Sequence, residues 1–338
     1  MNREAAIMAF LEGAGWGAAR RAPLAGDASA RRYERLRRGV WRAILMDLPP
    51  ESGLRAEPFL AVARWLTGHG LSAPEIFAAD PEAGFVLLED LGDDLVATLS
   101  ARDAAREPMY YAGAIDVLAA MQALPPPGGD WTPPPYDMAV LMREARLAPE
   151  WYIPATTGAD PSGDALSAFE ALAEAAFAPL LPASVVPVYR DYHAENLIWL
   201  PDRPGLGRIG LLDFQDMLIG HPAYDFVSLL RDARRDIGEE LASRMRQRFL
   251  AATGWEAEAF DRAAHVLSAQ RNLKLLGLFT RLCRRDGKAR YLDHLPRVWR
   301  YLEADLAHPA LDDLRLWVTR HVPPPDEAMR ARIAARAA

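Results

Sequence analysis

Two short runs near the middle of the chain carry side chains suited to chemistry. They are residues 189–196, YRDYHAEN, and residues 211–215, LLDFQ. A carboxylate such as Asp191 can orient an attacking hydroxyl group and take its proton. The amide oxygen of Asn196 and the carboxylate of Asp213 suit Mg²⁺, which prefers oxygen ligands. The order and spacing therefore predict phosphoryl transfer from ATP, with Asp191 as the base and Asn196 and Asp213 as the metal ligands.

Both runs lie where an apolar strand is expected to end. Residues 185–189 lead into the first run, and residues 209–212 lead into the second. Residues 197–200 are predicted to form a returning strand, and residues 201–205 its turn. The alternative is that these polar side chains only stabilise a loop and cap a helix. Because each run directly follows an apolar strand, the phosphoryl-transfer interpretation is favoured.

Composition limits the classes of protein that fit. The chain has 338 residues, of which 51% are hydrophobic and 25% charged, so a large core in two lobes is expected. We expect no membrane partner, because neither a transmembrane run nor a signal peptide is evident. A single cysteine, Cys283, suits a cytoplasmic protein. The net charge of −7 argues against nucleic-acid binding. The expected partner is a small molecule, without an obligatory protein partner.

The secondary structure predicted around the two runs changes near residue 90, from a sheet with two helices to mainly helices. Residues 2–18 and 59–68 are predicted helices, from the spacing of their apolar residues. A five-stranded antiparallel sheet is predicted, with strands that follow the first turn at residues 31–37, 41–48, 75–79 and 84–88. Residues 1–91 would thus form a small N-terminal nucleotide-binding lobe.

The rest of the chain is predicted to be mainly helical, with helices at residues 103–123 and from residue 137 onward. Residues 88–94 would form the hinge, where backbone groups of residues such as Glu89 and Leu91 hydrogen-bond the adenine ring. Residues 95–338 would form the catalytic and substrate-binding lobe. The predicted fold class is α+β, protein-kinase-like, with a large mainly helical C-terminal lobe.

The turn over the ATP phosphates is predicted at Gly26, Asp27, Ala28 and Ser29, because small residues let backbone N–H groups approach an anion. A plain hairpin turn would have a similar sequence. The cation expected beside the phosphates is a lysine on the third strand. Met46 occupies that position.

The missing lysine leaves two alternatives. Only two lysines occur in the chain, and both lie after residue 273. Either an arginine supplies the positive charge, with Arg31, Arg32 and Arg42 as candidates, or ATP is held chiefly through Mg²⁺ and the backbone. Glu57 is a candidate ion-pair partner, with a solvated helix-start carboxylate as the alternative.

The two runs resemble those of the aminoglycoside phosphotransferase and choline kinase superfamily, and the likeness spans residues 20–310. The resemblance implies a protein-kinase-like fold, Mg²⁺-ATP as phosphoryl donor, and the roles given above for Asp191, Asn196 and Asp213. Tyr189 stands where the family has a histidine that packs in the scaffold. Asp225 would brace the catalytic loop.

A narrower resemblance is to bacterial anomeric sugar kinases. It rests on residues 24–33 (LAGDASARRY), 44–50 (ILMDLPP), 190–196 (RDYHAEN), 213–216 (DFQD), 270–277 (QRNLKLLG) and 285–288 (RDGK). This likeness implies phosphorylation of the C1 hydroxyl of N-acetylmuramate and N-acetylglucosamine in cell-wall recycling. Met46 lies inside a matching segment, so the absent lysine would be a subfamily trait.

The segment predicted to cover the substrate, residues 270–297, is strongly basic. A cationic aminoglycoside or choline needs an acidic or aromatic wall, whereas a basic wall suits a neutral or carboxylate-bearing sugar. The predicted substrate contacts are His193, Asp216, Arg271, Asn272 and Lys274, and Asp47 is expected to face the same site. Two alternatives remain: a kinase for an aminoglycoside, choline or homoserine, and an inactive nucleotide-binding regulator.

Overall fold

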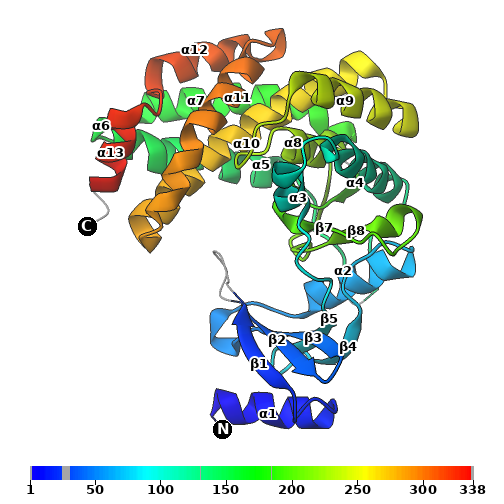
Figure 1. Cartoon of the computed structure of the whole chain (residues 1–338). Helices are drawn as coiled ribbons and strands as arrows, with labels where there is room; N and C mark the ends of the chain where they lie inside the picture. The colour runs from blue at the N-terminus through cyan, green and yellow to red at the C-terminus, as the bar shows by residue number, and fades with distance from the viewer. Residues whose placement is uncertain (1, 25–30, 130, 184, 336–338) are drawn as a thin grey trace. The chain divides into compact units, whose positions relative to one another are not determined.

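The computed structural model describes residues 2–24, 31–129, 131–183 and 185–335. The chain forms two compact units (Figure 1). The first contains residues 1–120, 125–133 and 194–217, and the second contains residues 121–124, 134–193 and 218–338. The predicted lobe boundary at residues 88–94 divides the chain differently and remains a prediction.

A five-stranded antiparallel sheet forms the N-terminal part of the first unit, as predicted. Its strands, in spatial order, are β1 (Arg20–Leu24), β2 (Arg32–Arg38), β3 (Trp41–Asp47), β5 (Phe85–Glu89) and β4 (Ile76–Asp80). Consecutive strands pair as hairpins except where the chain between β3 and β4 forms a helix. β3 is therefore the central strand, and side chains on both of its faces are buried.

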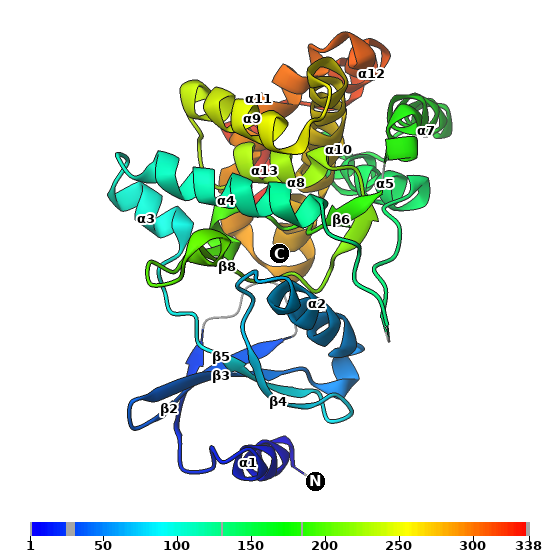
Figure 2. The same cartoon turned by 90° about the vertical axis from the view of Figure 1, so that its right-hand side faces the viewer.

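One helix covers each face of this sheet (Figures 1 and 2). α1 (Arg3–Gly13) packs on one face and is shorter than predicted, because the chain turns at Gly15 with a φ of +77°. α2 (Glu57–Gly68) covers the other face and buries apolar residues at helical spacing, including Phe59, Val62 and Leu66. Successive residues of β3, such as Leu45 and Met46, point to opposite faces of the sheet and are both fully buried.

The first unit also contains a hairpin from the middle of the chain. β7 (Leu197–Trp199) and β8 (Ile209–Leu211) pair in antiparallel fashion, as the sequence predicts. The backbone N–H of Trp199 donates to the carbonyl of Asp94 at 2.8 Å, and the N–H of Leu211 donates to Ser72 at 2.8 Å. The same unit contains α3 (Val96–Arg102) and most of α4 (Glu107–Gln122).

The second unit is mainly helical and contains one small strand pair, β6 (Val186–Val188) with β9 (Leu218–Gly220). Its helices are α5 (Met138–Ala145), α6 (Ile153–Thr157), α7 (Gly163–Phe177), α8 (Ala223–Leu230), α9 (Glu239–Thr253), α10 (Ala257–Asp286), α11 (Leu295–Leu306), α12 (Asp312–His321) and α13 (Glu327–Ala335). α10 is the central helix. Gly277 lets it approach Leu147 closely, because a Cβ there would lie 2.0 Å from the Leu147 carbonyl oxygen.

Among the described residues, one helical stretch has the length and composition of a candidate membrane span. It is Gly163–Ala183, with a mean hydropathy of 1.2 over an 18-residue window. Phe169, Ala173 and Phe177 form its buried face, and Phe169 packs on Trp317 with ring centroids 4.8 Å apart. Such one-sided burial is typical of a helix that covers a protein core.

Candidate active site

The loop that carries Asp191 follows β6 and is held by α8. The Asp225 carboxylate accepts the backbone N–H of Tyr189 at 2.6 Å and that of Arg190 at 2.8 Å. This is the bracing contact that the family resemblance implies. Arg190 has a φ of +77°, a left-handed conformation that costs energy in a residue with a side chain. The two hydrogen bonds to Asp225 help to stabilise that conformation.

Tyr189 occupies the position of the family's scaffold histidine and is fully buried. Its ring packs edge-on against Tyr192, with centroids 5.2 Å apart. The tyrosine therefore supplies the packing expected of the residue it replaces.

Asp191 lies among positive charges. Burial by itself would raise the pKa of its carboxyl group, but the positive charges of Lys274, Arg271 and Arg190 help to lower that pKa below its usual value. The carboxylate is thus the stable form at neutral pH. A base must be deprotonated before it can take a proton, so this electrostatic setting suits the predicted role.

Lys274 belongs to a buried ion cluster around Glu144 of α5. Its Nζ lies 2.9 Å from Glu144 Oε1 and 3.4 Å from the Tyr224 hydroxyl. Arg190 also pairs with Glu144, and the Tyr136 hydroxyl donates to the same carboxylate. Burial tends to raise the pKa of Glu144, but Lys274 and Arg190 lower it to about 2.

This cluster changes the interpretation of Lys274. Its ammonium group is occupied by protein partners, so the predicted sugar contact has no support in the structure. Instead, Lys274 and Arg190 are fixed by Glu144, next to the loop that carries Asp191. Glu144 was not predicted from the sequence. Its burial could have been inferred from the apolar residues near it in α5, such as Leu141 and Ala145.

The side chains of Arg271 and Asn272 contact different helices. The Arg271 Nη2 donates to Ser228 Oγ of α8 at 2.9 Å. The Asn272 amide donates to Ser268 Oγ at 3.3 Å and to Asp305 Oδ2 at 3.4 Å. Successive side chains of a helix diverge by about 100°. Arg271 therefore faces α8, and the predicted sugar contact of Asn272 has no support in the structure.

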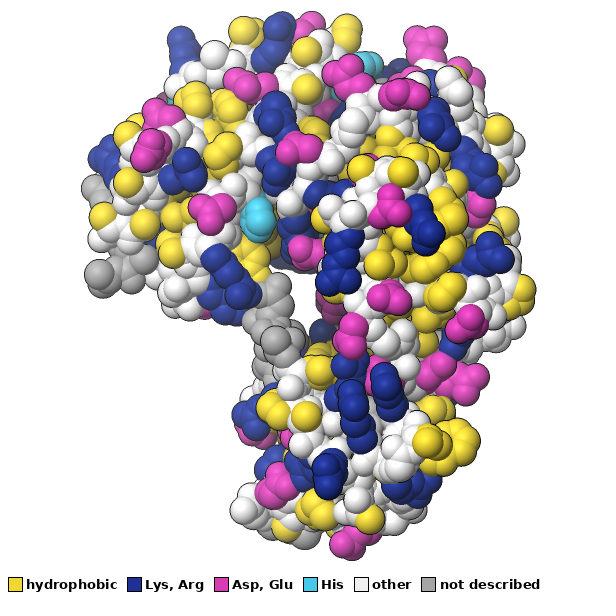
Figure 3. All heavy atoms as spheres, viewed as in Figure 1, with side chains coloured by type: hydrophobic (Ala, Val, Ile, Leu, Met, Phe, Trp, Pro, Cys, Tyr) yellow, Lys and Arg dark blue, Asp and Glu magenta, His cyan; other side chains and the backbone are white. Residues whose placement is uncertain are grey.

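Other basic residues of the 270–297 segment form ion pairs at the surface. Arg285 pairs with Asp286 at 2.7 Å, and Arg297 pairs with Asp236 at 2.9 Å. Basic and acidic side chains are interspersed over the face of the molecule in Figure 3. Arg285 and Arg297 thus have acidic partners at the surface, in contrast to buried Arg271 and Lys274.

His193 follows Asp191 by two residues and is only 4% exposed. Its backbone N–H donates to the Asp191 carbonyl at 3.0 Å. Burial, together with nearby Arg234, lowers the pKa of the imidazole to about 4. The ring is therefore neutral at physiological pH and can serve as a hydrogen-bonding group without carrying charge.

Acid should destabilise the second unit through His193 and His221. Burial lowers the pKa of both imidazoles to about 4, from an unfolded value of 6.5. Between these values the unfolded chain binds more protons, so stability is lost as pH falls from 6.5 toward 4. Each histidine should contribute about 1.4 kcal/mol per pH unit in that range.

Urea unfolding at pH 7.5 and pH 5.5 measures this loss. His221→Asn should reduce the pH dependence, because the asparagine oxygen can accept the Ala223 N–H that His221 Nδ1 now accepts at 3.1 Å. His69→Asn is the matched control, since His69 is exposed. An equal pH dependence in the wild type and the His221 variant would contradict the assignment for His221.

Asn196 and Asp213 lie close together in the first unit. Asn196 ends the short helical turn before β7, and Asp213 follows β8. The backbone N–H of Leu212 donates to the Asn196 carbonyl at 3.0 Å, which joins the two segments. Asp213 has a φ of +62°, and its side chain is 46% exposed. Its strained backbone presents the carboxylate at the surface of the unit.

Gln215 orients the two acidic side chains beside it. Its Nε2 donates to Asp213 Oδ1 at 2.7 Å and to Asp216 Oδ2 at 3.2 Å. Among the described residues, no group of three or more His, Cys, Asp or Glu side chains is arranged to bind a metal ion. The oxygen donors of Asn196 and Asp213 still fit Mg²⁺, which commonly takes one or two protein ligands and substrate phosphates.

Arg31 is the candidate arginine that lies beside the predicted metal ligands. Its side chain is 9% exposed, and Nη1 lies 3.7 Å from Asp213 Oδ1. Arg32 and Arg42 are exposed, and Met46 is fully buried in the sheet. The positive charge near Asp213 thus comes from the start of β2 and not from β3.

The predicted hinge residues are tied to other parts of the first unit. The Glu89 carboxylate pairs with Arg203 and accepts the Glu75 N–H at 3.3 Å. Leu91 is largely buried. Gly26, Asp27, Ala28 and Ser29, the predicted phosphate turn, lie outside the described residues.

Two carboxylates named in the sequence have protein partners. Asp47 is buried and accepts a hydrogen bond at 3.0 Å from Arg3 of α1. Glu57 begins α2 and pairs with Arg55 at 2.9 Å on the surface, in agreement with the alternative of a helix-start carboxylate. The N-terminal helix and a neighbouring arginine supply the partners that sequence spacing did not reveal.

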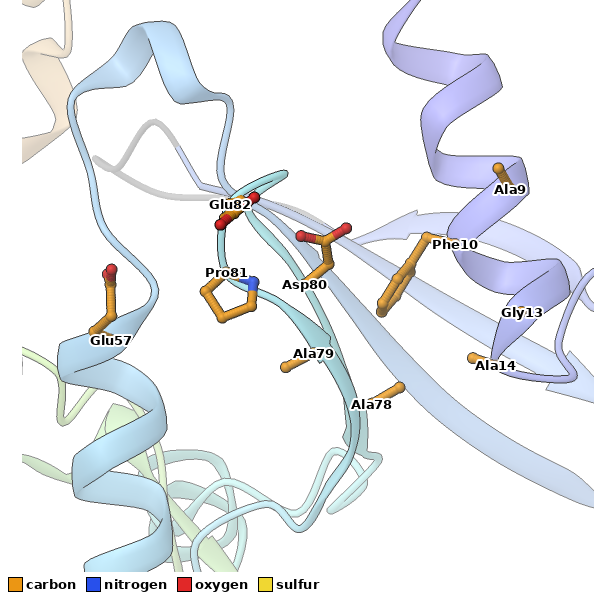
Figure 4. Close-up of a pocket in the computed structure, with 10 residues that line it drawn as sticks. All are labelled: Ala9, Phe10, Gly13, Ala14, Glu57, Ala78, Ala79, Asp80, Pro81 and Glu82. Carbon is orange, nitrogen blue, oxygen red and sulfur yellow. The ribbon is translucent and has the colours of Figure 1, made fainter. Parts of the chain in front are cut away.

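A hollow of about 700 Å³ in the first unit lies elsewhere (Figure 4). It is lined by α1 residues such as Phe10, by Glu57, and by the end of β4 with the following turn, including Asp80 and Glu82. Glu57, a candidate ion-pair partner from the sequence, lines it, whereas Asn196 and Asp213 do not. The hollow is therefore distinct from the part of the first unit that carries the predicted metal ligands.

Comparison of sequences relates this chain to known proteins. A family model described as "Phosphotransferase enzyme family" matches residues 20–266. A relative from Caulobacter vibrioides, named N-acetylmuramate/N-acetylglucosamine kinase, is 42% identical over 355 aligned positions, which cover 95% of this chain and 97% of the relative. A relative of the same name from Pseudomonas aeruginosa is 36% identical and covers 89% of each chain.

Solved structures share the fold. Choline kinase LicA from Streptococcus pneumoniae matches 99% of this chain and 100% of its own, with a TM-score of 0.57 and 12% identity. ADP-bound aminoglycoside phosphotransferase APH(2″)-Ib matches 84% of this chain and 92% of its own, with a TM-score of 0.57 and 15% identity. At these identities the likeness establishes the fold alone, and it confirms the predicted protein-kinase-like class.

Proposed function

This chain belongs to the phosphotransferase enzyme family, and on that premise we propose that it transfers the γ-phosphoryl group of ATP to the C1 hydroxyl of N-acetylmuramate and N-acetylglucosamine. The observation that carries the proposal is the 42% identity, over nearly the whole chain, with a relative named for these two sugars. Recycling of cell-wall sugars in the cytoplasm would be its physiological setting.

We assign the base to Asp191. It would accept a hydrogen bond from the C1 hydroxyl and take its proton as the new O–P bond forms. The neighbouring cations favour the carboxylate, and Asp225 and Glu144 restrict the loop that carries it. Phosphoryl transfer depends mainly on positioning and charge stabilisation. Fixing the acceptor is thus the chief contribution of this loop.

We assign Mg²⁺ binding to Asn196 and Asp213. The exposed Asp213 carboxylate and the half-buried Asn196 amide provide the hard oxygen donors that the ion needs. Bound Mg²⁺ would neutralise negative charge on the ATP phosphates. Gln215 would keep Asp213 in one orientation through their 2.7 Å hydrogen bond.

ATP would be bound by the first unit. Arg31 would contact the phosphates, with Arg32 and the turn of residues 26–29 as further contacts. Backbone groups of Glu89 and Leu91 would bind the adenine. Structures of the fold have been solved with bound AMP and ADP, which supports a nucleotide site.

Arg31→Ala should raise the KM for ATP about tenfold or more, because a hydrogen bond to a charged group contributes about 1.5–3 kcal/mol. Arg31→Lys should restore part of the affinity, since lysine keeps the charge but not the planar fork. Steady-state kinetics with varied ATP measure both. Arg37→Ala is the control, as Arg37 is an exposed residue of β2. A normal KM in Arg31→Ala together with a raised KM in Arg32→Ala or Arg42→Ala would contradict the assignment.

On the acceptor side, we assign sugar contacts to His193, Arg271 and Asp216. His193 is neutral and adjacent to the base in sequence, and Arg271 is a buried cation of the same unit. Lys274 and Asn272 remain predicted sugar contacts from the sequence, but their protein hydrogen bonds favour supporting roles.

Phosphorus NMR tests the proposed reaction. The protein is incubated with Mg²⁺-ATP and each sugar, and an anomeric C1-phosphate is expected from both. Parallel reactions with an aminoglycoside, choline and homoserine test the other acceptors of the superfamily. A product with one of these, and none with either sugar, would overturn the substrate assignment. ATP binding without consumption for any acceptor would instead support the inactive regulator.

A further inference from the structure

Several buried side chains of the second unit have polar atoms with no hydrogen-bond partner within the part of the chain that the structure describes. Among these atoms are Nε and Nη1 of Arg271, which is 5% exposed, and Oδ2 of Asp232, which is fully buried. Buried polar atoms are nearly always paired, because an unpaired one costs about 1–3 kcal/mol. Such atoms near a proposed active site point to a ligand.

Both side chains are tied to the elements that hold the catalytic loop. Asp225 of α8 binds the backbone of that loop. Three residues further along the helix, Ser228 Oγ donates to the Arg190 carbonyl at 3.3 Å and accepts Arg271 Nη2 at 2.9 Å. The spacing of three residues keeps Asp225 and Ser228 on one side of α8. Asp232 lies beyond the end of this helix at Leu230, in the segment that follows it.

Asp232 is held in one orientation. Its Oδ1 accepts the backbone N–H of Arg234 at 2.9 Å, and the Arg234 guanidinium lies 3.8 Å from the same oxygen. Asp232, Arg271 and Asp191 are all close enough to His193 to influence its charge. The two side chains with unpaired atoms thus share the surroundings of a residue next to the proposed base.

Their chemistry is complementary to an acidic amino sugar. A guanidinium group with an available N–H donor can donate a charge-assisted hydrogen bond to a carboxylate. A carboxylate oxygen accepts a hydrogen bond from a hydroxyl or amide N–H group. N-acetylmuramate carries a lactyl carboxylate, which N-acetylglucosamine lacks, and both sugars carry hydroxyl groups and an acetamido N–H.

We propose that Arg271 binds the lactyl carboxylate of N-acetylmuramate, while Asp232 accepts a hydrogen bond from a hydroxyl or N–H group common to both sugars. This inference rests on the proposed function and deepens it. Arg271 determines the preference for N-acetylmuramate over N-acetylglucosamine. Asp232 determines the affinity for both sugars.

The role of Arg271 is tested by comparing several acceptors in the wild type and in Arg271 variants. Three acceptors are compared: N-acetylmuramate, its methyl ester and N-acetylglucosamine. In the wild type, the ester should have a kcat/KM about 10- to 100-fold below that of the acid, the range for a hydrogen bond to a charged group. In Arg271→Met the acid and the ester should become equivalent, while the KM for N-acetylglucosamine changes little. Arg271→Lys should restore part of the difference.

Asp232→Asn tests the second contact. It should raise the KM for both sugars about tenfold, with kcat and the KM for ATP nearly unchanged. The ratio of kcat/KM between the sugars should stay as in the wild type. Arg285→Met, a surface variant of the same helix as Arg271, is the matched control and should leave every constant unchanged. Thermal unfolding with and without N-acetylmuramate shows whether each variant folds and still gains stability from the sugar.

The outcomes separate this inference from the proposed function. If the wild type phosphorylates neither sugar, the proposed function fails. If the wild type phosphorylates both and Arg271→Met still discriminates the acid from the ester, only the Arg271 assignment fails. If Asp232→Asn lowers stability but leaves both sugar KM values unchanged, Oδ2 has a structural role and its assignment fails.

Discussion

Asp191→Asn should lower kcat roughly 100- to 10,000-fold, the range for loss of general base catalysis. Asparagine keeps the size of the side chain but cannot take the proton of the C1 hydroxyl. Because Asp191 is assigned to the acceptor and not to the nucleotide, the dissociation constant for ATP should change little. Single-turnover phosphorylation of N-acetylmuramate measures the rate of the chemical step. ATP titration in the absence of sugar measures the dissociation constant for ATP.

Glu195→Gln is the matched control for this variant. Glu195 is an exposed carboxylate of the same loop, so neutralising it makes the same change of net charge without altering the assigned base. A fall in turnover equal to that of Asp191→Asn would show that the loop is sensitive to charge in general. Wild-type turnover in Asp191→Asn would refute Asp191 as the base.

Asp213→Asn should lower kcat/KM by more than about 100-fold, since loss of even an outer-shell contact can cost 10- to 100-fold in metal affinity or activity. The variant replaces an anionic ligand with a neutral one and leaves Arg31 without the carboxylate that lies 3.7 Å from its Nη1. The Mg²⁺ concentration that gives half-maximal activity should rise. Activity measured across a Mg²⁺ titration at fixed ATP checks both effects.

Asp202→Asn is a suitable control for Asp213, because Asp202 is exposed in the turn that joins β7 to the segment before β8. It should show the Mg²⁺ dependence of the wild type. The same Mg²⁺ dependence and activity in Asp213→Asn would exclude this carboxylate as a ligand. A stability loss without any change in Mg²⁺ dependence would indicate that its left-handed backbone serves the fold alone.

The sequence by itself determined the chemistry and much of the fold. The strands β2 to β5 were predicted to within one residue, since alternation and turn residues are local signals, whereas no bounds were predicted for β1. The order of Asp191, Asn196 and Asp213 indicated phosphoryl transfer, because hard metal ions and proton transfer restrict the residue types. The absence of a lysine from the third strand was also evident from the sequence, because both lysines lie after residue 273.

Only the tertiary structure decided which polar side chains have which partners. Sequence spacing left three arginines as substitutes for the lysine, and burial next to Asp213 distinguishes Arg31. It placed Lys274 at the sugar, whereas Glu144, 130 positions away in the chain, holds its ammonium group.

Asp232 gave no signal in the sequence, because one acidic residue in a basic loop resembles any surface carboxylate. Its significance comes from complete burial with one oxygen unpaired. Local patterns report backbone preference and residue chemistry, whereas burial and pairing depend on segments far apart in the chain. For that physical reason, the sequence indicates the reaction, whereas the three-dimensional structure gives the burial and the hydrogen-bond partners on which the proposed acceptor contacts rest.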